Sequence, residues 1–564
     1  MKRLVCGFFL VLSVLHTWPL TAGLPSQIKD DHDAILNVWT LGAIAQQVVK
    51  DPLHPLNVNM FYPFDAALAT LDPQLANGTI AAPVTWVSGN PVLGHNVFIL
   101  ATFVLSGLTM FLLVRELTGS VAAGLIAGCL YAFSPFRTNR LSHTHMLAGF
   151  WLPLMLLWIH RYVAEPRWGR LLVVVGVFVA LALSSWYLAA MGVVAALIVG
   201  IWSLAAHGHA RAAVPRAVAG VLLVFLILLP FGLPFARVKA WETSGGSGDV
   251  HTERAVAPLL ERTRRLFDRQ LDIGGRAKTS AELQHYFGVG PDARLWRSLR
   301  PLGFAEGSFF PGAIGLALAL LGCATGLSRR MANVPLAAVA ILPATAIVCA
   351  GLGWEDAWPV IVTRRGSLVV VMLLGVALWS LWRIRRDGAT RTNTIVRTYI
   401  ALIVAGMLLS FGPQVRAFGV DLGAGVYPSF VPPFGVLRVP ARFGVLFTVG
   451  IAVLAGLGAA WIESRIQRRA RWGALAGALL VINLEHAVAP MKFVSVPRIT
   501  PSDTWLKNAP AGPVVVFPTH NNPWALLNSL FHRKPIVNGS GLVAPPPYVR
   551  LNARDDLSPA MIEH

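Results

Sequence analysis

Three carboxylates occur within four positions in the segment IKDDHDAILNVWT, residues 28–40. Asp30, Asp31 and Asp33 follow the first apolar segment of a chain in which only 13% of the residues are charged. From Ala34 onwards apolar residues recur at helical spacing, which predicts an amphipathic helix at the membrane surface with Asp33 as its capping residue. A carboxylate here can meet both water-soluble and lipid-borne molecules. The residues alone therefore leave a capping role and a functional role open for Asp33.

Two arginines flank the expected start of a late apolar helix in the segment GVLRVPARFGVLF, residues 435–447. Pro440 suits a first helical turn, which places Arg438 just before the helix and Arg442 inside it. Guanidinium groups beside a helix N-terminus form a phosphate site, because their hydrogen bonds and the helix dipole act together. The alternative is contact with lipid headgroups. Phosphate binding is favoured, since arginine is disfavoured on the outer side of a membrane.

Further candidate substrate contacts lie in three short polar segments. The histidines of one segment are two positions apart, which does not place both on one helical face and does not favour a zinc pair. Aromatic side chains at an interface form a membrane belt and also stack on sugars. The candidates are Arg137, His143 and His145 within residues 133–151, Trp186 and Tyr187 within 184–190, and His285, Tyr286 and Glu306 within 281–312.

The composition identifies the class of protein that must position these residues. Of 564 residues, 55% are hydrophobic, which is typical of a polytopic membrane protein. The net charge of +20 is divided among short arginine clusters between apolar runs, so nucleic-acid binding is excluded. The four cysteines lie in or beside apolar runs without metal-ligand spacing, and we interpret them as core residues.

Windows of about 20 apolar residues predict an all-α fold with about 11–13 transmembrane helices and amphipathic helices in the extracytoplasmic loops. We expect the spans at residues 4–22, 92–114, 119–136, 146–162, 170–187, 188–206, 217–235, 308–327, 333–351, 366–384, 398–415, 443–462 and 472–490.

Basic residues give the expected orientation. A cytoplasmic N-terminus with Lys2 and Arg3 places the basic clusters of alternate loops on the cytoplasmic side, except for Arg364 and Arg365. Three large loops then face outwards, at residues 23–91, 236–307 and 413–442. Residues 261–270 of the second predict an amphipathic surface helix. Every polar cluster described above falls on this outer side.

The last part of the chain is more polar. Residues 1–490 are expected to form the transmembrane domain, and residues 491–564 a small α/β extracytoplasmic segment that could be truncated. Within that segment GPVVVFPTHNNPW, residues 512–524, predicts a buried strand followed by a turn.

Several motifs, in their order and spacing, carry a resemblance over nearly the whole chain. They are DAILNVW, FYPFDAALA, VSGNPVLGHN, RELTGSVAAGLIAGCLYAFSPFR, ALSSWYLA, HYFGVGP, EGSFFPG, LRVPARF and LFHRKPIVNGSG. In this series the sequence resembles bacterial membrane proteins of the GT-C glycosyltransferase superfamily, similar to its mannosyltransferases and arabinosyltransferases.

The resemblance implies a GT-C-like fold and transfer of a sugar from a polyprenyl-phosphate donor to an extracytoplasmic acceptor, at the bacterial inner membrane. It implies that Asp33 is the acidic residue of the first outer loop that takes part in catalysis, and that it acts as general base. Arg438 and Arg442 would then stabilise the leaving phosphate. Asp31 is the rival of Asp33, and the two together could instead hold Mg²⁺ or Mn²⁺ as a DxD-like pair.

Two other functions remain open on the sequence. A flippase or transporter for lipid-linked saccharides would place ionisable residues near the middle of the membrane, where this sequence has few. A non-catalytic protein that binds lipid-linked saccharides during envelope assembly would tolerate substitution of Asp33.

Overall fold

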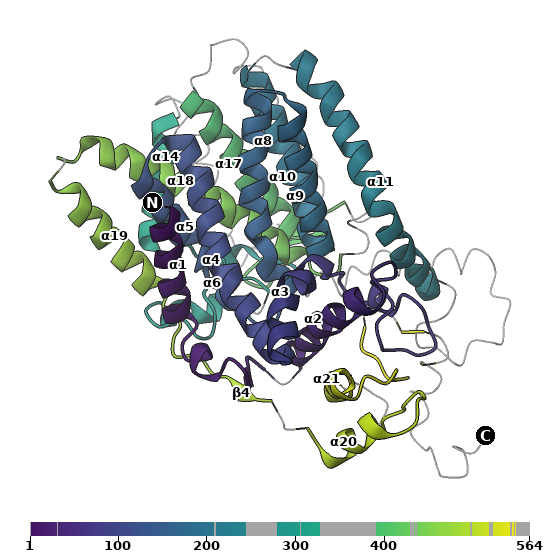
Figure 1. Ribbon diagram of the computed structural model, residues 1–564. Coiled ribbons are helices and arrows are strands. Elements are labelled where there is room, and N and C mark those ends of the chain that lie inside the picture. The colour runs from purple at the N-terminus through teal and green to yellow at the C-terminus, as the bar shows by residue number, and fades with distance from the viewer. Residues whose placement is uncertain are drawn as a thin grey trace.

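The described residues form a helical fold with two very small sheets (Figure 1). The computed structural model describes residues 2–30, 32–207, 210–243, 279–304, 306–326, 391–428, 434, 437–467, 469–496, 499–517, 523–541, 544, 545 and 548. Its α-helices are α1 (Lys2–His16), α2 (Asp33–Lys50), α3 (Leu75–Ser88), α4 (Pro91–Thr118), α5 (Val121–Ala132), α6 (Pro135–Thr138), α7 (Thr144–Leu147), α8 (Trp151–Ala164), α9 (Trp168–Ser184), α10 (Trp186–His207), α11 (Ala210–Thr243), α14 (Ala313–Gly326), α17 (Arg391–Ser410), α18 (Gly444–Arg465), α19 (Arg471–Glu485), α20 (Pro501–Asn508) and α21 (Pro523–His532).

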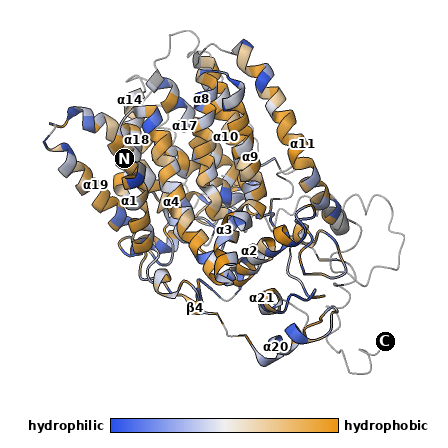
Figure 2. Cartoon of the chain, viewed as in Figure 1, coloured by the Kyte–Doolittle hydropathy of each residue, from blue (hydrophilic) through white to orange (hydrophobic). Residues whose placement is uncertain are grey.

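The described chain contains seven helices long and apolar enough to cross a membrane. They are Pro91–Thr118, Val121–Thr138, Thr144–Ala164, Trp186–Ala205, Arg211–Val238, Thr392–Ser410 and Pro440–Arg465. Shorter apolar helices at Arg3–His16, Trp168–Ser184 and Ala313–Thr325 coincide with further predicted spans. Apolar residues dominate these helices (Figure 2). The prediction of an all-α polytopic membrane protein is confirmed; the predicted spans at 333–351 and 366–384 and the surface helix at 261–270 lie outside the described residues.

Local signals define the helix ends. The side chain of Asn90 accepts hydrogen bonds from the backbone N–H groups of Val92 and Leu93 at the start of α4. Pro91 occupies the first turn, where a missing N–H is tolerated. The helix ends at Gly119, whose φ of +76° is the left-handed conformation that glycine adopts readily. These signals separate α4 from α5 by a short turn.

Close helix packing fixes the centre of the bundle. A Cβ atom on Gly322 of α14 would collide with the backbone carbonyl of Leu454, and one on Gly458 of α18 with that of Leu318. Glycine at both positions lets the two helix backbones touch, as in other membrane helix pairs. The pair supports the loops that precede α14 and α18, and these loops carry Glu306 and Arg442.

Helix α2 is more deeply buried than an amphipathic surface helix would be. It lies with α3 at one end of the bundle, above α20 and α21 in Figure 1. The polar residues Asn37, Thr40 and Gln47 of its predicted polar side are buried along with its apolar residues, while Lys50 is exposed. Asn37 donates a hydrogen bond to the carbonyl of Ser142 at 2.7 Å, and Gln47 donates one to that of His54 at 3.0 Å. Internal hydrogen bonds thus replace contact with water.

The C-terminal segment shares a hydrophobic core with the first loop. Trp39 of α2 and Leu68 of that loop belong to the same buried cluster as Leu526 of α21 and Ile536. Gln46 Nε2 donates a hydrogen bond to the carbonyl of Leu530 at 2.9 Å. The domain boundary at residue 490 stays a prediction, but the described part of residues 491–564 packs on α2.

The strands are short and lie outside the bundle. β1 (Gln27–Ile28) pairs antiparallel with β4 (Val494–Ser495), and β2 (Gln414–Ala417) pairs antiparallel with β3 (Val420–Ala424). The predicted buried strand near residue 514 is wrong, because Val514 makes only an isolated bridge to Ile536 and the side chains of Val515 and Phe517 are exposed. The side chains of residues 511–517 alternate between exposed and partly buried, so this apolar run does not contribute a strand to the core.

Candidate active site

The centre of the site is a carboxylate between two arginines. Glu306, in the loop before α14, faces Arg140 from the turn between α6 and α7 and Arg442 at the start of the last long apolar helix. Arg442 Nε and Nη2 donate hydrogen bonds to the two Glu306 oxygens at 3.0 and 3.2 Å, and Arg140 Nη1 donates one at 3.0 Å. The side chains of Arg140 and Arg442 are 4% and 9% exposed. This group of three is called the arginine–glutamate cluster below.

Asp33 lies close enough to this cluster for its charge to act on Arg140. It is the first residue of α2, and its side chain is 49% exposed. His143 Nε2 lies 3.4 Å from Asp33 Oδ2. The predicted capping role of Asp33 is wrong, because Asp30 instead accepts hydrogen bonds from the backbone N–H groups of His32 and Ala34. The Asp33 carboxylate, in the first turn of α2, therefore is not the cap of this helix.

Asp72 is a second, largely buried carboxylate, and His145 lies between it and Arg442. Asp72 accepts hydrogen bonds from the Ser185 hydroxyl at 2.8 Å and from the backbone N–H of Trp186 at 2.9 Å, at the start of α10. His145 Nε2 lies 3.9 Å from Asp72 Oδ2 and 3.2 Å from Arg442 Nη1. His145 therefore joins Asp72 to the arginine–glutamate cluster.

Tyr187 positions the segment that contains both predicted phosphate-binding arginines. Its hydroxyl accepts hydrogen bonds from the backbone N–H groups of Arg438 and Val439 at 2.9 and 3.1 Å. Its ring lies under the guanidinium of Arg442, 4.6 Å from Cζ to the ring centroid. Arg438 is exposed while Arg442 is buried, so the two arginines face different surroundings.

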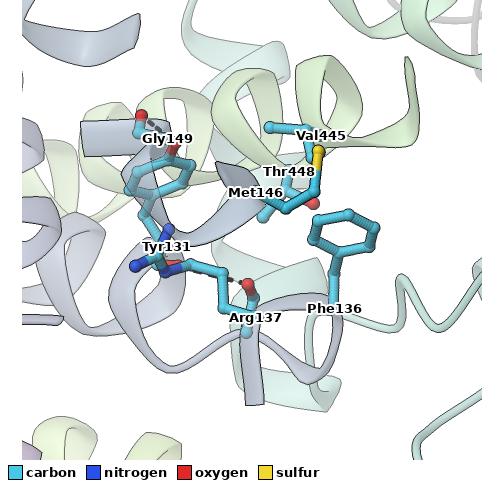
Figure 3. Close-up of a pocket in the computed structure, with 8 residues that line it drawn as sticks. Tyr131, Phe136, Arg137, Met146, Gly149, Val445 and Thr448 are labelled. Carbon is cyan, nitrogen blue, oxygen red and sulfur yellow. Dashed lines mark hydrogen bonds between the residues drawn. The ribbon is translucent and has the colours of Figure 1, made fainter. Parts of the chain in front are cut away.

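Arg137 is buried inside the helical bundle. Its guanidinium donates hydrogen bonds to the backbone carbonyls of Ala132, Leu147 and Thr102 at 3.2, 3.0 and 3.2 Å. Figure 3 shows it beside a small pocket, near Tyr131, whose hydroxyl donates a hydrogen bond to Gly149. A substrate contact by Arg137 stays a prediction, while the observed hydrogen bonds tie the ends of α5 and α7 to the middle of α4.

The remaining predicted contacts support the site from outside. The ring of Trp186 packs edge-on against Phe235 of α11, at a centroid distance of 5.2 Å. His285 accepts a hydrogen bond from the Glu282 backbone at 2.7 Å and stacks on Phe304, and Tyr286 is buried with its hydroxyl 2.6 Å from that of Ser410. His285, through Phe304, and Tyr286, through Phe309, pack on the segment that carries Glu306.

The surroundings shift the pKa values of the ionisable side chains of the site in different directions. Burial acts to raise the pKa of Glu306, but the guanidinium groups of Arg442 and Arg140 outweigh it and lower that pKa to about 2. Burial, with the charges of Arg140 and Arg442, lowers the pKa of His143 to about 4. Burial raises the pKa of Asp72 to about 6, against the opposing effect of its hydrogen bonds and of Arg442. At neutral pH Glu306 is thus a carboxylate and His143 a neutral imidazole.

Asp72 should make stability depend on pH. The folded protein binds this proton more tightly than the unfolded chain does, so the contribution to stability is present at low pH and is lost as the pH rises through about 6. The shift from 3.8 corresponds to about 3 kcal/mol. Asp72→Asn, which cannot ionise, should therefore raise the unfolding temperature in detergent well above that of the wild type at pH 8, and by less at pH 5.

The exposed Asp65 of the same loop provides a matched control. Asp65→Asn should leave the unfolding temperature unchanged at both pH values. An equal gain or an equal loss for Asp72→Asn at pH 8 and pH 5 would refute a buried ionisation cost.

Sequence reasoning did not select three residues of the site. Asp72 was missed although it is an acidic residue in a stretch with few charges, ATLDPQLANG, residues 69–78. Arg140 stands beside the chosen Arg137, yet it is Arg140 that reaches Glu306. Asp30 was not chosen either. Burial acts to raise its pKa, but hydrogen bonds from Ser142 and from the start of the helix outweigh burial and lower that pKa.

The sequence suggested that Asp31 and Asp33 hold a divalent cation, and this stays a prediction. Asp31 lies outside the described residues. In the parts of the chain that the structure describes, no group of three or more histidine, cysteine, aspartate and glutamate residues could hold a metal ion. Both Glu306 oxygens already accept hydrogen bonds from arginine, and Arg442 occupies the Nε2 side of His145.

The fold and the site together define a polytopic helical membrane protein with an ionic cluster at one end of its bundle. Residues 55–352 match the family described as "Domain of unknown function (DUF6311)". This match covers more than half of the 564 residues, and the chain belongs to that family. No curated protein matches the chain.

Solved structures give further likenesses. The archaeal oligosaccharyltransferase AglB from Archaeoglobus fulgidus, in complex with an inhibitory peptide and a dolichol-phosphate, is 13% identical with a TM-score of 0.45, over 96% of this chain and 65% of that chain. The same enzyme with Zn and sulfate has 13% identity and a TM-score of 0.42, over 96% and 62%. ArnT from Cupriavidus metallidurans in the apo state has 12% identity and a TM-score of 0.35, over 98% and 87%. The chain thus spans less than two thirds of the length of AglB.

Proposed function

We propose that the protein is an integral membrane glycosyltransferase that moves a sugar from a polyprenyl-phosphate donor to an extracytoplasmic acceptor. The observation that carries this proposal is the position of Asp33. A half-exposed carboxylate contacts His143 and acts electrostatically on the buried Arg140, at one end of a bundle of membrane-spanning helices. An anionic lipid headgroup and a water-borne hydroxyl can meet at such a place.

The reaction follows from these charges. The acceptor hydroxyl oxygen attacks the anomeric carbon of the sugar, and the bond from that carbon to the phosphate oxygen breaks. Asp33 takes the hydroxyl proton, and polyprenyl phosphate leaves with the electron pair of the broken bond. Arg438 and Arg442 stabilise the charge that develops on this phosphate. One inversion of configuration at the anomeric carbon is expected.

The proposed orientation places this reaction on the outer side of the bacterial inner membrane. The cytoplasmic side would carry the ion pairs at the opposite ends of the helices, such as Arg161 with Glu116 and Arg170 with Glu165. The C-terminal segment, which packs on α2, would then be extracytoplasmic. Basic residues in alternate loops support this assignment.

A transfer assay tests the proposal. Purified full-length protein is incubated with a panel of radiolabelled polyprenyl-phosphate sugars and an envelope extract as a source of acceptors. At least one donor should lose its sugar to an acceptor, and Asp33→Asn should abolish this transfer. Equal transfer by the wild type and by Asp33→Asn would contradict the role of Asp33.

Donor affinity tests the arginines separately. Arg438→Ala should weaken donor binding about 10- to 100-fold, because one charge-assisted hydrogen bond to phosphate contributes about 1.5–3 kcal/mol. The protein should remain folded, since the Arg438 side chain is exposed. Equilibrium binding of a polyprenyl phosphate measures the change. Arg416→Ala, in the nearby β2, is the matched control and should bind as the wild type does; unchanged affinity in Arg438→Ala would remove Arg438 from the phosphate site.

A further inference from the structure

We propose that Asp72 is a positioning residue, which fixes the start of α10 and, through Tyr187, the segment that carries the phosphate-binding arginines. This inference rests on the proposed function, which assigns the donor phosphate to Arg438 and Arg442. Hydrogen bonds and a ring contact connect Asp72 to both arginines.

Asp72 caps α10 from a distant segment. A single extended residue, Ser185, with φ −168° and ψ 135°, separates α9 from α10. Helix α10 begins at Trp186, and the first N–H groups of a helix find no acceptor within the helix itself. Asp72 accepts a hydrogen bond from the Trp186 N–H at 2.9 Å and one from the Ser185 hydroxyl at 2.8 Å, across more than 110 positions of sequence. The carboxylate also interacts favourably with the positive end of the helix dipole.

Tyr187 lies in the first turn of α10 and contacts the arginine segment. Its hydroxyl accepts hydrogen bonds from the backbone N–H groups of Arg438 and Val439 at 2.9 and 3.1 Å. Its ring centroid lies 4.6 Å from Cζ of Arg442. The charge of Asp72 also acts on both Tyr187 and Arg442. A displaced start of α10 would therefore move the hydroxyl and the ring together, and both arginines would lose support.

The segment that carries Asp72 is itself anchored to the helix that begins with Asp33. Gln74, two positions after Asp72, donates a hydrogen bond from Nε2 to Asn37 Oδ1 at 2.8 Å. Asn37 lies one turn after Asp33 and donates to its backbone carbonyl at 2.8 Å. Both amide side chains are buried. Asp72 thus connects the helix of the proposed base with the segment of the proposed phosphate site.

Two substitutions separate the hydrogen bonds of Asp72 from its charge. Asp72→Asn and Asp72→Ala both remove the negative charge. The amide of asparagine can still accept from the Trp186 N–H and donate to the Ser185 oxygen, whereas alanine leaves both groups without this partner. Asp65→Ala, at an exposed position of the same loop, is the control for loss of an aspartate.

Backbone hydrogen exchange of full-length protein in detergent measures the position of the arginine segment without a donor. Fragments that contain Arg438 and Val439 should exchange about 5- to 10-fold faster in Asp72→Ala and in Tyr187→Phe, because hydrogen bonds that protect them are weakened or lost. Asp72→Asn and Asp65→Ala should exchange as the wild type does. Adding Asp72→Ala to Tyr187→Phe should have no further effect. Fragments of α4 should be unchanged in every variant, which separates positioning from a general loss of stability.

Binding of polyprenyl phosphate tests the connection with the donor. Asp72→Ala should bind about 5- to 10-fold more weakly than Asp72→Asn, because the two proteins have the same charge and differ in the support of the arginine segment. Equilibrium binding in detergent measures the ratio.

Other outcomes have distinct meanings. Wild-type exchange in Asp72→Ala overturns the inference, and so does equally fast exchange in Asp72→Asn and Asp72→Ala. A further increase when Asp72→Ala is added to Tyr187→Phe overturns the connection through Tyr187. Equal affinities of Asp72→Ala and Asp72→Asn overturn the role in donor binding. If the wild type neither binds polyprenyl phosphate nor transfers a sugar, the proposed function fails, while the exchange rates still decide whether Asp72 positions the arginine segment.

Discussion

Replacing Asp33 by asparagine should lower the rate of sugar transfer by about 10²- to 10⁴-fold, the contribution expected of a general base. Asparagine has nearly the same shape and can keep the contact with His143, but it cannot accept the proton of the acceptor hydroxyl. Donor affinity should change little, because the phosphate is assigned to arginines. Steady-state transfer rates at saturating donor measure the effect.

The control for this variant is Asp65→Asn. Asp65 is an exposed carboxylate of the same loop, and the arginine–glutamate cluster does not include it. The Asp65→Asn protein should transfer sugar at the wild-type rate. If Asp33→Asn lowers donor affinity but leaves the maximal rate unchanged, Asp33 is a binding residue and the base must be sought elsewhere.

Replacing Glu306 by glutamine should destabilise the folded protein by about 3–5 kcal/mol, because two buried guanidinium groups lose their shared carboxylate. Arg140 and Arg442 would then repel each other with little water to screen them. Unfolding in detergent, followed by circular dichroism, measures the loss. Transfer should fall as well, since Arg442 would no longer be held in place.

Glu165→Gln gives the comparison for this prediction. Glu165 pairs with Arg167 and Arg170 at the surface, with its side chain 51% exposed. An exposed pair contributes at most about 1 kcal/mol. Equal stability losses in Glu165→Gln and Glu306→Gln would show that burial does not give the arginine–glutamate cluster its importance.

Much of the transmembrane fold could be predicted because lipid requires long apolar helices. The predicted range 92–114 lies inside α4, and 443–462 coincides closely with α18. The burial of helix α2 was harder to predict, because its polar residues form hydrogen bonds with side chains and backbone groups of distant segments. Asn37, for example, donates to Ser142 and accepts from Thr144, more than one hundred positions away. Such pairing leaves no periodic signal in the sequence.

The site was only partly predictable for the same physical reason. Asp33 and Glu306 could be selected because acidic residues are few in this chain, and Arg442 because arginine is disfavoured on the outer side of a membrane. Their arrangement could not, because the ionic contact between Glu306 and Arg442 joins residues 136 positions apart. Asp72 was missed because its burial and its contacts with the start of α10 are tertiary.

The most direct test of a glycosyltransferase follows both parts of the donor. The protein is reconstituted into liposomes with a polyprenyl-phosphate sugar labelled separately in the sugar and in the lipid, together with the acceptor extract. We predict that the wild type forms one polyprenyl phosphate for each sugar that becomes attached to an acceptor, and that Asp33→Asn forms neither product. A donor that crosses the bilayer intact, or is bound and recovered uncleaved in every case, would contradict sugar transfer and would indicate a flippase or a binding protein.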